Sequence, residues 1–322
     1  MADTDQPYVY VEADGRLHFG VLDLRGSLGR WFGGIGAASS ALSVLVSARR
    51  ADRFDVEGED GARAAEFARR CLAYYNLESG VHVRVHRALP PHSGLGSGTQ
   101  LALAVARAIS VAHGVERDVS ELARSVGRAS RSAIGTWTFA GGGLVLEGGR
   151  RRGSSDVGPL LVRMPIPECW RCVLVVPSEH AGLNGAAEEA AFAHLPPPSE
   201  EDVHRVAHLV LMGLLPAVAD SDLAGFGTAL TELQQVTGRW FASIQGGTFA
   251  AGLSAEMIRR MAEWGVPGVG QSSWGPAVYG IVDGDPAASR LADRVRSAVD
   301  GRASVHVGRF SSTGARVWRA DE

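Results

Sequence analysis

The segment at residues 90–100, PPHSGLGSGTQ, has the residue types of an anion-binding loop. Three glycines within five residues let the backbone approach a ligand closely and adopt positive φ angles. An apolar helix is expected to follow, with Ser97 or Thr99 as its cap. The N–H groups of its first turn and the positive end of its dipole would then favour a phosphate. A glycine-rich turn that only lets the helix pack closely is the alternative.

Two other segments carry polar side chains suited to a binding site. Arg16 and His18 stand two residues apart on an expected strand, so their side chains share one face. Residues 268–276, GVGQSSWGP, form a second loop of small residues ahead of an expected strand. From residue types alone, a ligand loop and a structural turn are equally compatible with this late loop.

Two further motifs give weaker signals. Glu179 follows an expected strand and precedes a helix, which makes it a candidate for the site, whereas His180 alone is typical of a surface loop. Cys169 and Cys172 have CxxC spacing, but no second pair of zinc ligands lies nearby and the second cysteine enters a strand. We therefore expect a structural role for both cysteines.

The basic residues limit the chemistry, because all 32 of them are arginine and the sequence contains no lysine. This excludes a Schiff base with pyridoxal phosphate and a Walker-A loop, both of which need a lysine amine. A phosphate must instead be bound by arginine, a metal or a helix N-terminus. The 35 acidic residues give a net charge of −3, which argues against a nucleic-acid partner.

Export and membrane attachment are not expected. The first ten residues lack a basic segment followed by an apolar one, so no signal peptide is predicted. The longest apolar stretch, Val206–Ala219, includes His208 and Pro216 and falls short of about 20 spanning residues. Three cysteines are too few for a disulfide scaffold. We expect a cytoplasmic protein with no membrane partner, and a homodimer because twofold dimers are the commonest assembly.

Hydrophobic periodicity predicts the elements that position the loops in the first half of the chain. A hairpin is expected around a turn at Asp14-Gly15, between strands at 8–11 and 17–21. The other predicted elements are strands at 41–48, 54–56 and 81–85, helices at 62–77, 99–113 and 119–129, and a strand pair at 136–147.

A linker rich in glycine, serine and arginine is expected at 148–159, with the three arginines at 150–152 in solvent. It predicts domains at 1–158 and 159–322. The second domain is expected to contain strands at 160–164, 172–176, 276–282 and 303–307, and helices at 186–194, 200–220 (capped by Ser199), 222–237, 255–265 and 286–299. Strands and helices mix without a regular βαβ rhythm, so the predicted fold class is α+β rather than a doubly wound sheet.

The motif at 91–98, PHSGLGSG, resembles the central motif of the GHMP kinase superfamily. The N-terminal strand and the late loop match the other two motifs of that superfamily in order. The resemblance implies a GHMP-kinase-like fold, with an N-terminal ribosomal-protein-S5-domain-2-like domain, a ferredoxin-like C-terminal domain and an active site between them. One departure weakens a kinase interpretation. Gly135 stands where many of these kinases have their catalytic aspartate, and Glu121 is the acid nearest to the expected magnesium ligand.

Four segments together look like a narrower branch, the β-ribofuranosylaminobenzene 5′-phosphate synthases of tetrahydromethanopterin biosynthesis. The segments are residues 16–20, 94–100, 131–136 and 271–276. The resemblance implies a pentosyltransferase that condenses phosphoribosyl pyrophosphate with 4-hydroxybenzoate or 4-aminobenzoate, and releases pyrophosphate and carbon dioxide. Magnesium is implied for the pyrophosphate. Pyridoxal phosphate is not, because loss of carbon dioxide itself restores the aromatic ring.

This chemistry suggests roles for individual residues. Arg131, with Arg16 and Arg128 as further candidates, would bind phosphate oxygens through two N–H groups at once. His18 or Glu179 would accept a hydrogen bond or proton from the para substituent. The predicted catalytic residues are therefore His18, Arg131 and Glu179. The predicted substrate- and phosphate-binding residues are Arg16, Ser93, Gly94, Leu95, Gly96, Ser97, Gly98, Thr99, Gln100, Ser132, Gly135, Gln271, Ser272, Ser273 and Trp274.

The aromatic slot and the metal have fewer signals. Trp274 and Phe19 are named as walls for the ring, with packing in a hydrophobic core as the alternative for each. Asp23 is the acid named for a metal ion. An ATP-dependent small-molecule kinase of the same superfamily is the second functional hypothesis, and an inactive relative that senses a nucleotide or sugar phosphate is the third.

Overall fold

The computed structural model describes residues 7–78, 80–178 and 195–320. Its larger sheet has eight strands in the order β12-β1-β2-β4-β3, with β5 and β6 paired to β2, and β7 paired to β5. All of these pairs are antiparallel except β3 with β4. The strands are β1 (Tyr8–Asp23), β2 (Arg30–Ala51), β3 (Asp55–Gly58), β4 (Gly80–Arg87), β5 (Leu144–Glu147), β6 (Arg150–Arg151), β7 (Leu160–Met164) and β12 (Arg316–Ala320).

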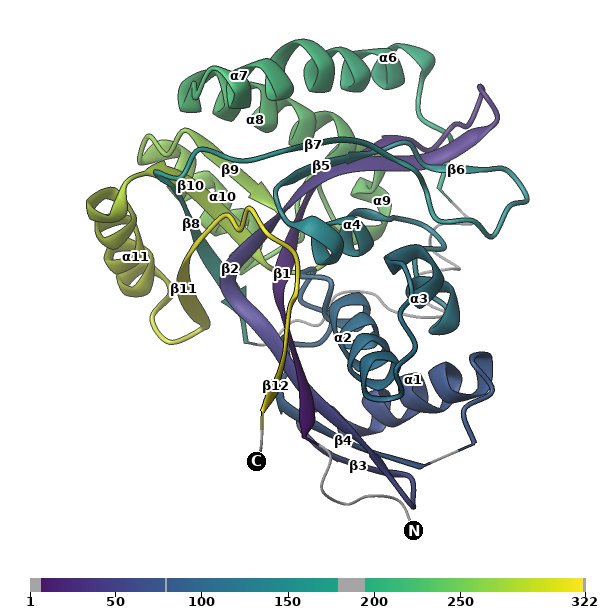
Figure 1. The fold of residues 1–322 in the computed structure, drawn as a ribbon. Helices are drawn as coiled ribbons and strands as arrows, with labels where there is room; N and C mark the ends of the chain where they lie inside the picture. The colour runs from purple at the N-terminus through teal and green to yellow at the C-terminus, as the bar shows by residue number, and fades with distance from the viewer. Residues whose placement is uncertain (1–6, 79, 179–194, 321–322) are drawn as a thin grey trace.

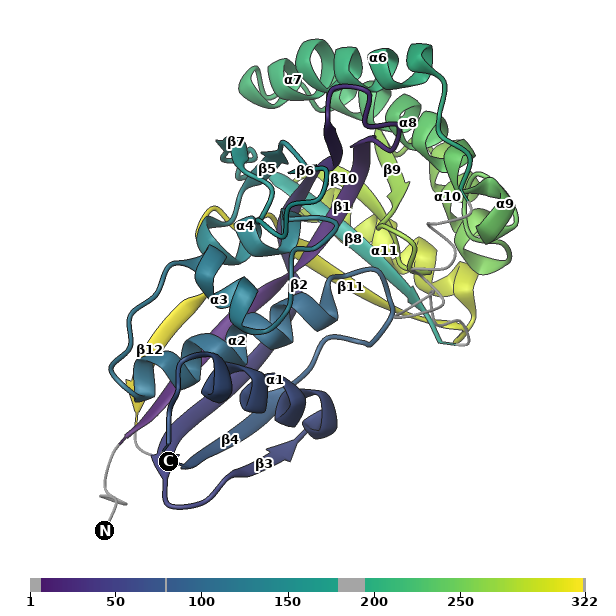
Figure 2. The same cartoon turned by 90° about the vertical axis from the view of Figure 1, so that its right-hand side faces the viewer.

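Strands β1 and β2 form one long hairpin that runs through the molecule (Figures 1 and 2). The hairpin predicted around Asp14-Gly15 is wrong, because β1 continues through these residues and only its register against β2 shifts there. A Cβ at Gly15 would lie 3.3 Å from the Leu42 carbonyl oxygen, so a small residue suits this crowded shift. The chain reverses instead between residues 23 and 30.

The two halves of β1 belong to different hydrophobic cores, which explains why the strand is long. Val9 and Val11 pack in a core with α1 and α2, whereas Leu17 and Val21 pack in a core with α6 and α8. The helices of the first half are α1 (Gly61–Tyr74), α2 (Ser97–Ala112), α3 (Val119–Ser125) and α4 (Ile134–Gly141). The helices predicted at 62–77, 99–113 and 119–129 are confirmed, with α3 shorter than expected.

The strand pair predicted at 136–147 is wrong in its first half. Residues Ile134–Gly141 form α4, and only Leu144–Glu147 forms a strand. A short buried apolar run does not distinguish helix from strand by its periodicity. Gly142 and Gly143 both have positive φ angles, of 62° and 75°, and make the reversal between the two elements.

A second sheet of four strands has the order β11-β8-β10-β9 and is antiparallel throughout. Alternate residues of β8 face different cores, Leu174 toward α8 and Val175 toward α10 and α11, so helices cover both faces. The strands are β8 (Trp170–Pro177), β9 (Gly268–Gln271), β10 (Val278–Asp283) and β11 (Ala303–Arg309). The helices are α6 (Glu200–Leu209), the π-helix η1 (Val210–Leu214), α7 (Leu215–Ala219), α8 (Leu223–Trp240), α9 (Ala242–Gln245), α10 (Leu253–Glu263) and α11 (Asp285–Val299).

Helices α6, η1 and α7 form a continuous rod at one end of the molecule (Figure 1). The Ser199 hydroxyl accepts a hydrogen bond from the Asp202 N–H, which confirms the predicted cap. Within the described part of the chain, Glu200–Ala219 is the one helical stretch long and apolar enough to cross a membrane, by length and composition alone. Val206 and Leu214 of this stretch lie in the core with α8, whereas Leu211 and Met212 are exposed. The helix predicted at 186–194 lies outside the described residues.

The larger sheet contains strands from both sides of residue 158. Strand β6 lies inside the predicted linker and pairs with β2, while β7 and β12 follow the linker and pair with β5 and β1. The predicted linker is therefore part of the sheet. Its arginines lie largely in solvent as predicted, since Arg151 and Arg152 are exposed, with the Arg152 guanidinium 4.6 Å from the centre of the Trp31 ring.

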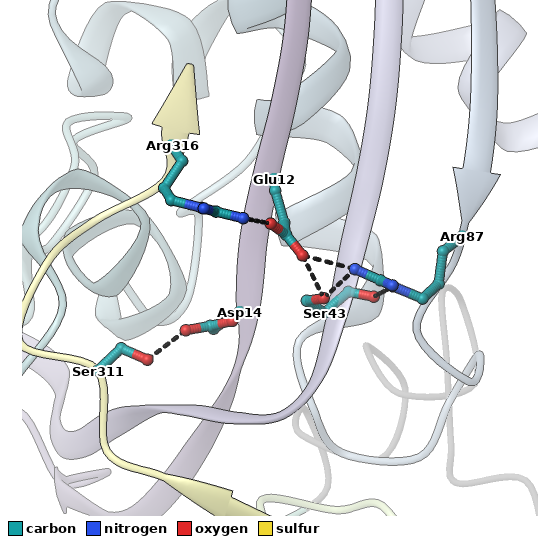
Figure 3. A network of polar contacts seen from close by, with 6 residues as sticks. All are labelled: Glu12, Asp14, Ser43, Arg87, Ser311 and Arg316. Carbon is teal, nitrogen blue, oxygen red and sulfur yellow. Dashed lines mark hydrogen bonds and ion pairs between the residues drawn. The ribbon is translucent and has the colours of Figure 1, made fainter. Parts of the chain in front are cut away.

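Polar contacts hold the returning C-terminal strand against β1 (Figure 3). Glu12 pairs with Arg316 of β12 and also accepts a hydrogen bond of 2.6 Å from Arg87 at the end of β4. The Ser311 hydroxyl donates to Asp14, also on β1. These contacts hold β1 in place at Glu12 and Asp14. Farther along the same strand, Arg16 and His18 line a cavity.

Candidate active site

The three predicted motifs meet at the hydroxyl group of Ser272, which is fully buried. This hydroxyl donates to the Gly94 carbonyl oxygen at 2.7 Å and accepts from the His18 backbone N–H at 3.0 Å. The Arg16 guanidinium also donates to the Gly94 carbonyl oxygen. One strand and two loops, far apart in the sequence, are thereby joined at one point.

The glycine loop allows close backbone contact and begins α2 without a side-chain cap. Gly94 has a φ of 89°, and a Cβ there would lie 2.0 Å from the Ser272 carbonyl oxygen. Gly96 is the N-cap of α2 in the left-handed conformation, so the predicted cap by Ser97 or Thr99 is wrong. The N–H groups at the start of a helix have no partner within the helix, and this end of α2 can therefore bind an anion.

A cavity of about 610 Å³ opens beside these loops. Its size is ordinary for a small-molecule site. It is lined by most of the residues that the sequence predicted, and these lining residues are Arg16, His18, Gly94, Gly96, Ser97, Gly98, Thr99, Arg131, Ser132, Gln271, Ser273 and Trp274. The structure thus brings the predicted segments together around one space.

Besides Arg16, four of the described arginines line the cavity, and the sequence prediction missed two of them, Arg63 and Arg70. Arg63 and Arg70 reach it from α1, and Arg128 and Arg131 reach it from the loop after α3. Burial lowers the pKa of Arg128, and the neighbouring charges of Arg63 and Arg70 lower it further. Arg63 and Arg70 are seven residues apart, or about two helical turns, so their shared face on the predicted helix was a readable signal.

The second group of lining residues is aromatic. The rings of Trp274 and Phe241 have their centres 4.6 Å apart and are tilted by 56°. Phe32 and Phe249 line the same cavity. Phe19, also named as a wall, has its ring in the core, with its centre 5.9 Å from that of Phe226 in an edge-to-face pair. Phe19 is among the residues that line the cavity, but its side chain is fully buried and packs in the core.

A network of glutamines supports the late loop. The Gln271 amide nitrogen donates to the Gln245 side chain at 3.2 Å and to the Ser273 carbonyl oxygen at 3.1 Å, and its oxygen accepts from the Ala250 N–H at 2.7 Å. The backbone N–H of Gln271 donates to the Gln234 side chain at 2.9 Å. Gln271 therefore makes hydrogen bonds within the protein, and these hold the loop that carries Trp274.

His18 lies in the cavity as a neutral imidazole at pH 7. Burial lowers its pKa to about 3, and the adjacent Arg16 charge acts in the same direction. A neutral imidazole has one N–H donor and one acceptor nitrogen. His18 can therefore accept a hydrogen bond from a hydroxyl or amino group without carrying a positive charge itself.

Several predicted residues do not line the cavity. Ser93 donates to the Pro90 carbonyl oxygen at 2.8 Å within its own loop, and Leu95 lies in the core. Gln100 is buried and donates to the Gly135 carbonyl oxygen at 3.0 Å. These residues, like Ser272, contact other parts of the protein and support the residues that line the cavity. Glu179 and His180 lie outside the described residues.

A buried carboxyl group supports the loop that carries Arg131 and Ser132. Glu147, at the end of β5, accepts hydrogen bonds from the N–H groups of Ala133 at 3.2 Å and Gly149 at 2.7 Å. Burial raises its pKa to about 7, although these two donors and the Arg30 charge act in the opposite direction. This role could not be predicted from sequence, because Glu147 is an ordinary residue at the end of a predicted strand.

The described residues do not form a metal site. No group of three or more histidine, cysteine or acidic side chains is present among them, and Glu66 is the single acid among the described lining residues. Asp23 lies elsewhere and accepts from the N–H groups of Arg25 and Gly26, which makes it a turn residue. Burial raises the pKa of the Cys172 thiol to about 12, in keeping with the structural role expected for it, whereas Cys169 is exposed.

The position at which many of these kinases have their catalytic aspartate leaves little room for a side chain. Gly135 is buried near the start of α4, and a Cβ there would lie 3.0 Å from the Thr99 Cγ2 atom. The described lining residues contain no aspartate. Glu121 forms an ion pair of 3.1 Å with Arg117 and does not line the cavity. The described residues thus provide neither the catalytic aspartate nor the metal-binding glutamate of a GHMP-type kinase.

Comparison with known proteins agrees with this geometry. The family described as GHMP kinases N terminal domain matches residues 62–142. A protein of Methanothermobacter thermautotrophicus named beta-ribofuranosylphenol 5'-phosphate synthase is 32% identical over 297 residues, which cover 86% of this chain and 89% of the relative. A protein of the same name from Archaeoglobus fulgidus is 34% identical over 280 residues, which cover 83% and 86%.

Solved structures share the fold at low sequence identity. A homoserine kinase from Cytophaga hutchinsonii has a TM-score of 0.68 at 18% identity and covers 99% of both chains. A mevalonate diphosphate decarboxylase from Staphylococcus aureus has a TM-score of 0.66 at 14% identity, with 97% of this chain and 98% of the other covered. The predicted α+β fold of the GHMP kinase type is confirmed.

Proposed function

The chain belongs to the beta-ribofuranosylphenol 5'-phosphate synthase family, and we propose that it condenses phosphoribosyl pyrophosphate with 4-hydroxybenzoate. It is an enzyme of the pentosyltransferase type. The observation that carries the proposal is one cavity that combines arginines and a helix N-terminus with aromatic walls. These two linings match an anionic sugar donor and a flat aromatic acceptor.

The donor side must stabilise a departing anion. When the bond between C1 of the ribose and pyrophosphate breaks, negative charge develops on pyrophosphate and positive charge on C1. The first-turn N–H groups of α2 and the guanidinium groups of Arg16 and Arg131 lie where they would bind phosphate oxygens. Their charge is fixed in place before the reaction, so the protein need not reorganise as the anion leaves.

The acceptor side must hold a benzoate ring with its carboxylate-bearing carbon toward C1. A new carbon–carbon bond forms at that carbon, the bond to the carboxylate breaks, and its electron pair restores the aromatic ring as carbon dioxide leaves. Trp274 and Phe241 would pack against the ring, and neutral His18 would accept a hydrogen bond from the para hydroxyl group. The reaction needs no imine, which agrees with a sequence that contains no lysine.

The acceptor follows from the chemistry of the relatives' name. That name specifies a phenol product, which a 4-hydroxybenzoate acceptor gives directly. An acceptor with an amino group in place of the hydroxyl would give an aniline. We therefore propose 4-hydroxybenzoate as the acceptor, in a pathway such as tetrahydromethanopterin biosynthesis.

Magnesium is proposed only as a counter-ion of the pyrophosphate. The described cavity residues fit an anion rather than a cation, since five arginines and one acid line it. No step is assigned to a metal ion. A soluble cytoplasmic homodimer is proposed on general grounds, since twofold dimers are the commonest assembly.

The direct test measures labelled carbon dioxide released from ring-carboxyl-labelled 4-hydroxybenzoate in the presence of phosphoribosyl pyrophosphate and magnesium. We expect release from this acid, and slower release or none from labelled 4-aminobenzoate. Reactions without phosphoribosyl pyrophosphate are the control for spontaneous decarboxylation. Turnover of ATP with an alcohol, and no labelled carbon dioxide from either acid, would contradict the proposal in favour of a kinase.

A further inference from the structure

Three arginines outside the glycine motif, Arg63, Arg70 and Arg128, line the same cavity as the first turn of α2. The Arg128 guanidinium lies so close to Gly98 that a Cβ there would be 2.9 Å from its Nη2 atom. A Cβ at Gly127 would likewise lie 2.9 Å from the Arg70 Nη1 atom. Arg63 and Arg70 line the same cavity from one face of α1. Because Gly98 and Gly127 have no side chain, the guanidinium groups of Arg128 and Arg70 can lie close to the backbone at these two positions.

The cluster has more positive charge than its own acids balance. Arg63 pairs with Asp60 at 2.7 Å, and Arg70 pairs with Glu66. With Arg128, three guanidinium groups face two carboxylates, which leaves an excess of one positive charge (three minus two) before Arg131 is counted.

Two buried donors in this cluster lack partners. The Nε atoms of Arg63 and Arg128 have no hydrogen-bond partner among the described residues. Buried N–H donors without partners are rare and costly in folded proteins. Both guanidinium groups are therefore incompletely satisfied by the described residues.

Resting on the proposed function, we propose that Arg63, Arg70 and Arg128 form a diphosphate subsite. They bind the pyrophosphate end of the donor directly, without a metal ion held by acidic side chains. Arginine suits this task because its planar fork binds two phosphate oxygens at once and its charge does not depend on pH in the working range. The site thus recognises a diphosphate by fixed guanidinium groups instead of acidic metal ligands.

The test is calorimetric titration of the full chain with inorganic pyrophosphate in a buffer that contains EDTA. We expect saturable binding by the unmodified protein without metal. Arg63→Gln, Arg70→Gln and Arg128→Gln should each weaken binding by about tenfold or more, as expected for the loss of a charge-assisted hydrogen bond. Arg69→Gln is the matched control, because Arg69 neighbours Arg70 but lies over the Phe54 ring and does not line the cavity. Its affinity should stay within about twofold.

The outcomes are distinct from those of the proposed function. Pyrophosphate binding that requires magnesium, or site variants that bind as tightly as Arg69→Gln, would overturn the diphosphate subsite even if labelled carbon dioxide is released. Metal-free binding that the three variants weaken would support the subsite even if no carbon dioxide is released. If circular dichroism shows that a glutamine variant does not fold, the lysine variant at the same position replaces it. Lysine keeps the positive charge, so this variant should lose less affinity for pyrophosphate than the glutamine variants at the other two positions.

Discussion

Replacing Ser272 with alanine should separate the structural joint of the site from its chemistry. The Ser272 hydroxyl links the His18 N–H to the Gly94 carbonyl oxygen, at 3.0 and 2.7 Å, and is fully buried. Alanine leaves the His18 N–H without an acceptor, which costs about 1–3 kcal/mol. The Gly94 carbonyl oxygen keeps the Arg16 guanidinium as a donor, so the second lost bond costs only about 0.5–1.5 kcal/mol.

The variant should therefore lower the free energy of unfolding by about 1.5–4.5 kcal/mol. Urea unfolding followed by circular dichroism measures this change as a lower midpoint at an unchanged slope. Because the joint also positions Arg16 and the glycine loop, kcat/KM for phosphoribosyl pyrophosphate should fall at least about tenfold, or 1.4 kcal/mol.

Ser110→Ala is the matched control. Ser110 is equally buried, but its hydroxyl donates only to the Arg107 carbonyl oxygen in its own helix, at 3.1 Å. We expect a stability loss of at most about 1 kcal/mol and unchanged kinetics. If Ser272→Ala is no less stable than Ser110→Ala, the argument that this hydroxyl joins the three segments is refuted.

Three further predictions concern single positions. Arg131→Ala should lower kcat/KM for phosphoribosyl pyrophosphate by about 10–150-fold, equivalent to 1.5–3 kcal/mol, and unchanged initial rates with a folded protein would remove Arg131 from the site. Gly94→Ala should abolish carbon dioxide release, because its Cβ would lie 2.0 Å from the Ser272 carbonyl oxygen at a φ of 89°; full activity would show that the loop is not closely packed. Burial raises the pKa of Glu147 from 4.5 to about 7, so its stabilising contribution is complete below pH 4.5 and is lost as the pH rises through 7. The urea midpoint should fall across this window, by an amount on the order of 3 kcal/mol, and Glu147→Gln should flatten the profile.

The elements that the sequence predicted well are those with strong local signals. The helix after the glycine loop and the strand with alternating Val81, Val83 and Val85 are both present, because periodicity reports which side is buried. The turn at Asp14-Gly15 and the strand at 136–141 were wrong because distant partners decided them. Asp14 lies in a long strand whose two halves pack in different cores, and the 136–141 run is a helix with Thr136, Thr138 and Phe139 buried.

The candidate site shows the same division. Residues of the glycine motif and Trp274 could be named from sequence because their loops resemble known motifs, and they do line the cavity. Arg63 and Arg70 were missed because a charged pair on a helix face is usually solvated, and only the packing of α1 beside α2 turns it toward the cavity. Gln271 was named as a ligand residue, whereas the structure uses its side chain to hold the loop.

The sequence by itself determined the chemistry that the protein is able to perform. Some of its limits are properties of residue type and hold wherever the residues lie in space. The glycine-rich loop and the arginines favour phosphate binding, and glycine at position 135 disfavours a kinase base. The tertiary structure alone added Arg63 and Arg70 to the arginines of the site and decided which hydroxyl joins its parts. The physical reason is distance along the chain. His18 and Ser272 are 254 residues apart, and only the packing of two cores on one long strand brings them within a hydrogen bond.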